Sequence, residues 1–148
     1  MASPLTMYIP IKQDANSQTA AKLAVQTFTN GTKDLDQTKV IHYATLALIP
    51  NPSGKGALAL LLTTRFDLAM RPYIATFWGK DGTGLTSVIK GLSSISLNPP
   101  PSINTLDELI TYINSVNLTP IPEDLKWTNF YEAYGQTVSQ IKDKFPGK

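Results

Sequence analysis

The sequence predicts an α+β fold: a single ferredoxin-like domain over residues 1–148, with a four-stranded antiparallel sheet, helices on one face, and assembly as a dimeric α+β barrel. Three observations predict it. Strand-like and helix-like segments follow the order β-α-β-β-α-β, which is the split βαβ plan. Two neighbouring strands are apolar on both faces, and the length of 148 residues suits one domain.

The spacing at which apolar residues recur distinguishes the predicted strands from the predicted helices. A period of two and β-branched side chains indicate strands, spacings of three and four indicate helices, and Gly or Pro clusters end both. The predicted elements are strand 6–12, helix 17–29, strands 40–49 and 57–66, a helix carrying Tyr73, Ile74, Phe77 and Trp78 that ends at 79–82, further helical turns over 85–92, an extended or irregular stretch over 93–104, a helix from 105 to about 116, strand 127–134, and a short helix with Val138, Ile141 and Phe145.

Local signals predict where several helices begin. Asn16 or Ser17 is suited to cap the first helix, and Asp67 to cap the helix that follows the third strand. Thr105 and Glu108 have the spacing of a capping box, in which the hydroxyl and the carboxylate each bond a free backbone amide.

The composition excludes several classes of protein. Charged residues make up 16% of the chain, against a typical ~25%, and the net charge of +2 gives no field for nucleic acid or a membrane surface. The absence of cysteine excludes disulfides, thiolate zinc sites and cysteine nucleophiles. The longest nearly apolar stretch, 57–62, is far below the ~20 residues of a membrane span, and the first residues lack the pattern of a signal peptide. We therefore expect a cytoplasmic protein with no nucleic-acid or membrane partner.

The second and third predicted strands are apolar on both faces, and this pattern predicts a partner. Helices on one side cover only one face of an antiparallel sheet. Burying each Leu or Ile of the other face stabilises the assembled protein by roughly 1.5–3 kcal/mol, so such a patch should not remain exposed to water. We expect the same sheet of a second copy to cover it; alternatively, the extra helices or the proline segment fold back over it in a monomer. The opposed sets are Val40, Ala44, Leu46 and Leu48 against Ile41, Tyr43, Ala47 and Ile49, and Leu58, Leu60 and Leu62 against Ala57, Ala59 and Leu61.

Three segments together resemble a group of uncharacterised dimeric α+β barrel proteins. They are IHYATLALI at 41–49, LLLTTRFD at 60–67 and FYEAYGQTVSQI at 130–141. The family pattern has a His-Phe/Tyr-Ala strand, a Phe/Tyr-Asp-Gly-like step and a late Phe-Tyr-x-x-Tyr…Thr-Val-x-Gln-Ile segment; this chain has Leu68 where the pattern prefers Gly. The resemblance implies the barrel fold. It does not select an activity, because the wider superfamily includes cofactor-free monooxygenases, haem peroxidases and members without a known reaction.

One end of the predicted hairpin gathers residues that suit a small-molecule site. His42, the only histidine, is expected opposite residue 64 or 65, at the same end of the sheet as Arg65 and Asp67. His42 would act as base or ligand, Arg65 would contact an anion, and Asp67 would orient the imidazole. The alternative is a half-buried strand histidine bonded to a carboxylate, with Arg65 and Asp67 in a structural pair or cap. A register shift of one residue would put His42 and Arg65 on opposite faces.

Tyr43, Tyr131 and Tyr134 form the second candidate group. A phenol beside a histidine would position a carbonyl or another oxygen-containing substrate, with Tyr43 and Tyr134 in the catalytic role and Tyr131 as a ligand contact. Tyr131 and Tyr134 have opposite parity on a strand, so they share a face only if the strand bulges. The alternative is aromatic packing with the hydroxyls at the rim.

These observations lead to one main functional hypothesis and three alternatives. We expect a homodimer that binds a small apolar or oxygen-containing molecule between the sheet and the helices, with His42 and Arg65 as polar contacts. A cofactor-free monooxygenase or isomerase would use His42 as base and Tyr43 or Tyr134 to orient a carbonyl. A haem-dependent oxidoreductase would use His42 as the axial ligand, and a structural or interaction domain would have no reaction. No cofactor and no metal are expected, because one histidine and scattered acids do not form a ligand set.

Overall fold

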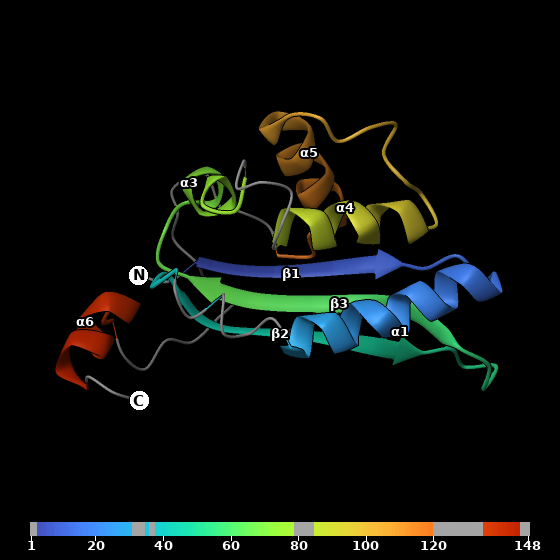
Figure 1. Cartoon of the computed structure of the whole chain (residues 1–148), viewed down its shortest axis with the longest axis horizontal. Helices are drawn as coiled ribbons and strands as arrows, with labels where there is room; N and C mark the ends of the chain where they lie inside the picture. The colour runs from blue at the N-terminus through green and yellow to red at the C-terminus, as the bar shows by residue number, and fades with distance from the viewer. Residues whose placement is uncertain (1–2, 31–34, 36–37, 79–84, 120–134, 146–148) are drawn as a thin grey trace.

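Figure 1 shows the protein as a computed structural model, which describes residues 3–30, 35, 38–78, 85–119 and 135–145. In these ranges a three-stranded antiparallel sheet is accompanied by five helices. None of the helices within the described ranges combines the length and the apolar content needed to cross a bilayer.

The sheet is built from β1 (Ser3–Pro10), β2 (Ile41–Pro50) and β3 (Ala57–Phe66), in the order β1-β3-β2. Since β3 is antiparallel to both neighbours, β1 and β2 run in the same direction with β3 between them. The helix α1 (Ala15–Asn30) connects β1 to β2, which completes a split βαβ unit. The predicted strand 57–66 is confirmed, the second strand lies one residue later than predicted, and β1 begins and ends earlier.

Two predicted helix caps are wrong, and one capping box is confirmed. The carboxylate of Asp14, not Asn16 or Ser17, caps α1 by accepting from the amide and the hydroxyl of Ser17, at 2.9 and 2.7 Å. The predicted capping box at the start of α5 (Leu106–Val116) is present, with both reciprocal hydrogen bonds. The N-cap of α3 (Met70–Ala75) is Ala69, which makes no side-chain hydrogen bond, so Asp67 does not cap this helix. The other two helices described after β3 are α4 (Leu85–Ile95) and α6 (Val138–Lys144).

Helix α4 is longer than predicted and includes two serines in its last turn. The hydroxyls of Ser93 and Ser94 donate to the backbone oxygens of Lys90 and Gly91, at 2.7 and 2.6 Å. Such bonds satisfy polar side chains inside a last turn. The predicted irregular stretch therefore starts after Ile95. The predicted strand 127–134 lies outside the described residues, so the fourth strand and the complete ferredoxin-like plan stay predictions.

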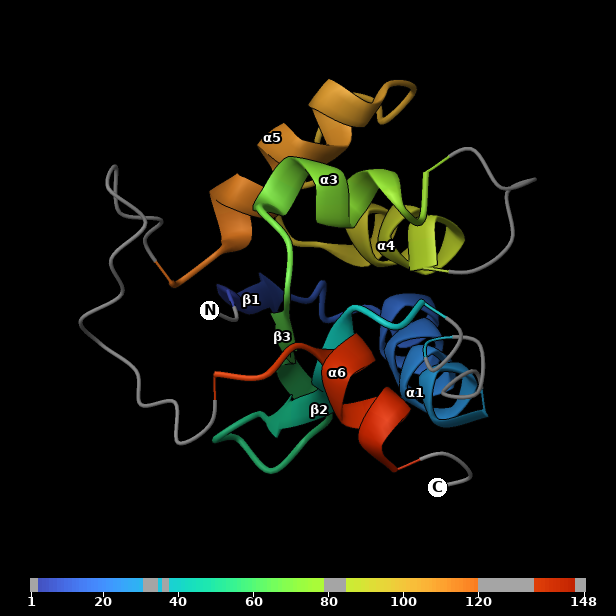
Figure 2. The ribbon, with the colours of Figure 1, turned by 90° about the vertical axis from the view of Figure 1, so that its left-hand side faces the viewer.

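The core lies between the sheet and the helices. Figure 2 shows α1 and α4 on one side of the sheet, with α3 and α5 above its β1 edge. The ring of Phe66 stacks on that of Tyr73 with centroids 3.7 Å apart, and Phe77 meets Tyr73 edge-on. Burial raises the pKa of Tyr73 to about 12. The strands contribute to this core Leu5, Met7, Ile9, Leu46, Ala57, Leu60, Leu62 and Phe66.

The opposite side of the sheet, which we term the open face, carries no described helix (Figure 2). Alternate residues of each strand point to it, and cross-strand partners share it. Its side chains lie outside the core cluster, although that of Ala59 is fully buried. Two of its rows are polar, and the two rows toward the β2–β3 turn are apolar. The rows, read across β1, β3 and β2, are Pro4–Arg65–Tyr43, Thr6–Thr63–Thr45, Tyr8–Leu61–Ala47 and Pro10–Ala59–Ile49.

The two-sided apolar pattern is thus present, with two corrections at the strand ends. Ile41 was expected on the same face as Tyr43, but it packs against the core, while Tyr43 is 50% exposed. Ala57 is buried in the core cluster and Leu58 is exposed, which reverses their predicted sides. Both corrections arise where the β2–β3 register shifts, since each shift inserts an unpaired residue that changes the alternation.

Candidate functional site

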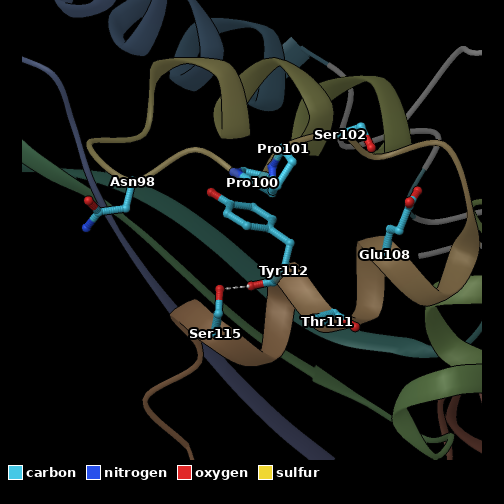
Figure 3. A pocket seen from close by; sticks show the side chains of 8 residues that line it. All are labelled: Asn98, Pro100, Pro101, Ser102, Glu108, Thr111, Tyr112 and Ser115. Carbon is cyan, nitrogen blue, oxygen red and sulfur yellow. Dashed lines mark hydrogen bonds between the residues drawn. The ribbon is translucent and has the colours of Figure 1, made fainter.

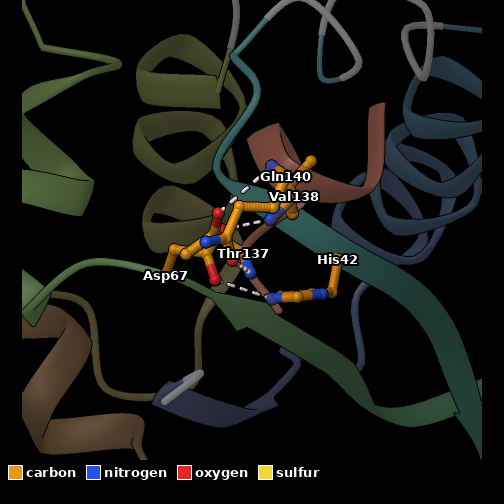
Figure 4. Close-up of polar contacts among 5 residues, drawn as sticks. All are labelled: His42, Asp67, Thr137, Val138 and Gln140. Carbon is orange, nitrogen blue, oxygen red and sulfur yellow. Dashed lines mark hydrogen bonds and ion pairs between the residues drawn. The ribbon is translucent and has the colours of Figure 1, made fainter. Parts of the chain in front are cut away.

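His42 occupies a β-bulge at the end of the sheet. The β2–β3 register passes from Ile41 opposite Phe66 to Tyr43 opposite Arg65, so His42 has no partner in β3. A bulge redirects the side chain of its extra residue. Here it lets the imidazole reach past the end of β3 to Asp67, as Figure 4 shows.

Asp67 joins three parts of the fold. Its Oδ1 atom lies 2.7 Å from Nε2 of His42, and its Oδ2 atom accepts a hydrogen bond of 2.7 Å from the backbone amide of Val138 (Figure 4). Its own backbone amide donates to the oxygen of Val40 at 2.9 Å. The side chains of His42 and Asp67 are 18% and 11% exposed, so water screens this contact only weakly. We call the three groups, His42, Asp67 and the Val138 amide, the clamp.

The clamp holds the start of α6 against the sheet. Val138 is the first residue of α6, and its side chain is 6% exposed. Thr137 and Gln140 form a second capping box at this helix, so the side chain of Asp67 supplies a further acceptor from a distant part of the chain. A carboxylate beside the first amides of a helix is favourable. Asp67 is therefore a cap, as one reading of the sequence expected, but of α6 instead of α3.

Arg65 lies at the same end of the sheet as the clamp, as predicted, and Tyr43 lies beside it. They are cross-strand partners in the first polar row of the open face, and Arg65 is partly buried. The imidazole of His42 turns toward Asp67, beyond the end of the strand, while the Arg65–Tyr43 pair belongs to the open face. The structure thus brings His42 together with Asp67 and Arg65 together with Tyr43. Tyr131 and Tyr134 lie outside the described residues, and their roles stay predictions.

The arrangement has chemical as well as structural potential. A carboxylate that holds one ring nitrogen of a histidine orients the imidazole for proton transfer or ligation at the other nitrogen. Within the described ranges, however, no group of three His, Cys, Asp or Glu side chains is placed to hold a metal ion. The second carboxylate oxygen of Asp67 also accepts a hydrogen bond from a backbone amide. The described contacts therefore favour the structural interpretation, in which the pair fastens α6.

A pocket of about 310 Å³ lies away from the clamp, between α5 and the segment 98–102 (Figure 3). Sequence reasoning treated 93–104 as irregular and did not single out this region. The one signal there is the α5 face with Glu108, Thr111, Tyr112 and Ser115, whose spacing puts all four on one side of a helix. Burial raises the pKa of Tyr112.

Comparison of the chain with protein-family models, curated proteins and solved structures finds no significant match. The resemblance to dimeric α+β barrel proteins therefore stays a prediction.

Proposed function

We propose that this protein is a non-catalytic interaction domain that works as a homodimer, with the open faces of two sheets packed against each other. The single observation that carries the proposal is the pair of apolar rows on a face separate from the core. Tyr8, Leu61 and Ala47 form one row, and Pro10 and Ile49 flank the fully buried Ala59 in the other. Contiguous apolar surface of this kind marks an interaction site in soluble proteins.

Two short segments widen the open face beyond β1. The amide of Leu97 donates to the oxygen of Pro10 at 2.8 Å, and the amide of Leu118 donates to the oxygen of Thr6 at 2.7 Å. Two isolated antiparallel bridges fix the register of these segments on β1. Leu97 thus lies beside Pro10 and Leu118 beside Thr6, and such neighbours share a face. Both leucines, 57% and 63% exposed, add to the open face.

The area of the open face suits a small specific interface. Four strand spacings of ~4.8 Å and eight residues at ~3.4 Å each give roughly 19 by 27 Å, or about 500 Å² per copy. Two copies would bury about 1,000 Å² in total, at the lower limit for a specific interface. A second copy suits a weakly charged face because a two-fold interface needs only self-complementarity.

The alternative, a small molecule between the sheet and the helices, receives less support. Met7, Ile9, Leu60, Phe66 and Ile113 have no exposed surface, so side chains fill that layer. The contacts of the clamp are explained by its role in holding α6 against the sheet, so they do not require a ligand. The proton-transfer and haem hypotheses for His42 rest on the imidazole alone, and the apolar rows favour self-association over both.

The test is the molar mass of the protein in solution across concentration, by sedimentation velocity. Leu97→Lys places a charge on the open face, and Leu23→Lys makes the same change on the outer surface of α1. The two leucines are matched in exposure, at 57% and 59%. We expect the wild type and Leu23→Lys to sediment as dimers. Leu97→Lys should shift toward monomer at concentrations where the control stays dimeric.

Circular dichroism of the three proteins separates loss of assembly from loss of fold. A monomeric wild type at high micromolar concentration would overturn the proposal, as would equal sedimentation of the two folded variants. Leu61→Lys, in the centre of the face, gives a second variant should Leu97→Lys unfold.

A further inference from the structure

The pocket beside α5 is a groove with one helical wall and one proline wall (Figure 3). The helical wall is the α5 face from Glu108 to Ser115, and the proline wall is the segment with Pro100 and Pro101. The volume of about 310 Å³ lies at the lower end of the range for small-molecule sites. None of the residues that line the groove belongs to the rows of the open face.

The floor and sides of the groove are largely apolar, because the hydroxyls along α5 bond to the helix backbone. The Thr111 hydroxyl donates to the oxygen of Asp107 at 2.8 Å, and the Ser115 hydroxyl donates to the oxygen of Tyr112 at 2.7 Å. Their methyl and methylene groups, the proline rings and the tyrosine ring remain to contact a ligand. A ligand with an apolar body fits these walls.

The charge of the groove is negative. Glu108 is the one ionisable acid among its lining residues, and none of those residues is basic. Hydrogen bonds from the backbone amides of Asn104 and Thr105 lower the pKa of Glu108, so the side chain is ionised at neutral pH. Both amides bond to Oε2, at 2.6 and 2.9 Å. The groove therefore attracts cations and repels carboxylates and phosphates.

A second polar group, the hydroxyl of Tyr112, is buried in the groove without a hydrogen-bond partner. The Ser96 hydroxyl lies close enough to offset part of the effect of burial on the pKa of Tyr112, but the two do not reach hydrogen-bond geometry. Figure 3 shows the ring of Tyr112 between α5 and Pro100, with its hydroxyl directed away from the helix. An unmade hydrogen bond of a buried hydroxyl is unfavourable, and a donor on a ligand would supply one after a small shift of the exposed proline segment.

We propose that this groove binds small organic ammonium ions that carry an apolar body. The ammonium group would pair with Glu108, and the apolar part would lie along Pro100, Thr111 and Tyr112. An ammonium has only donors, and both the Glu108 carboxylate, whose Oε2 atom already accepts two backbone amides, and the tyrosine oxygen are acceptors for it.

The test compares three ligands of one shape by NMR titration of the backbone amides. Benzylamine, benzyl alcohol and benzoate share a ring and differ in charge, from positive through neutral to negative. We expect benzylamine to bind most tightly and to shift the amides of residues 98–115. Benzoate should bind most weakly. Equal affinities for the three ligands, or shifts confined to other parts of the chain, would overturn the proposal.

A variant that keeps the helix cap isolates the charge. Glu108→Gln preserves the capping box, because Gln140 fills the same position in the capping box of α6. Its affinity for benzylamine should fall about threefold, the effect of one exposed ion pair, while its affinity for benzyl alcohol stays unchanged. Asp107→Asn removes a neighbouring charge that does not line the groove and should leave both affinities unchanged. A threefold loss in Asp107→Asn as well, or none in Glu108→Gln, would contradict a contact with Glu108.

Discussion

Removing the Asp67 carboxylate should release α6 from the sheet and destabilise the whole domain. The carboxylate takes part in two contacts of 2.7 Å, one with His42 and one with the Val138 amide. A hydrogen bond to a charged group contributes about 1.5–3 kcal/mol, and both partners are largely buried here. Taking the lower figure twice, Asp67→Ala should lower the free energy of unfolding by about 3 kcal/mol.

His42→Ala removes only one of these contacts, so it serves as the matched comparison. We expect it to lower the free energy of unfolding by about 1.5 kcal/mol. In the double variant, the effects of His42→Ala and Asp67→Ala should fall short of additivity by about 1.5 kcal/mol, since both remove the same contact. Asp67→Asn, which keeps an acceptor for Val138, should fall between the two single alanine variants.

Urea titration measures these differences, and hydrogen exchange locates them. With a slope of about 1.5 kcal/mol/M for a domain of this size, a loss of 3 kcal/mol lowers the midpoint by about 2 M. The amides of α6 should exchange faster in Asp67→Ala than in His42→Ala, because only Asp67 contacts Val138. The reasoning fails if Asp67→Ala costs less than about 0.5 kcal/mol, or if exchange in α6 is the same in all variants.

Three further predictions concern single side chains. Gly56→Ala should lower the free energy of unfolding by about 2 kcal/mol and Gly54→Ala by about 1 kcal/mol, because both glycines have positive φ. Only at Gly56 would the new Cβ meet Gln18 Oε1, 2.5 Å away, and Gln18 cannot move aside without losing its hydrogen bonds to Lys12 and Ala57. Equal urea midpoints of the two variants would contradict this. Tyr112→Phe should leave stability unchanged or raise it by up to about 1 kcal/mol, since the lost hydroxyl has no partner; a clear loss in the same titration would refute it. Because two amides lower the pKa of Glu108, its stabilisation is present above the ordinary value of 4.5 and is lost as the pH falls through the lowered pKa; Glu108→Gln should flatten that acid limb, and an unaltered pH profile of stability would contradict the argument.

Sequence reasoning succeeded where the physical cause is local. The strand over 57–66 follows from a run of apolar and β-branched residues between turn signals, and the structure has the same bounds. The Thr105 and Glu108 capping box depends on side chains three residues apart, which the sequence displays directly. The first helix was located, but its cap was not, because Asp14, Asn16 and Ser17 are all suitable residue types and only the geometry selects among them.

The clamp could not be predicted completely, for two physical reasons. The bulge at His42 inserts one residue into a pairing that simple hairpin arithmetic treats as regular, and it redirects that side chain. The bond from Val138 to Asp67 spans 71 residues, and nothing near either residue in the sequence indicates it. Asp67 is a suitable residue type for capping the next helix, but the tertiary structure places its carboxylate at the start of α6.

The two segments that widen the open face also change what can happen along the margin of the sheet. On β1, the backbone groups that point away from β3 belong to Pro4, Thr6, Tyr8 and Pro10. Both prolines lack an amide hydrogen, and the amide of Thr6 donates to the Asn117 side chain. Few free backbone amide and carbonyl groups therefore remain on this side of β1 for a strand from another molecule to pair with. This margin thus disfavours the strand-by-strand growth of chains into fibrils along β1.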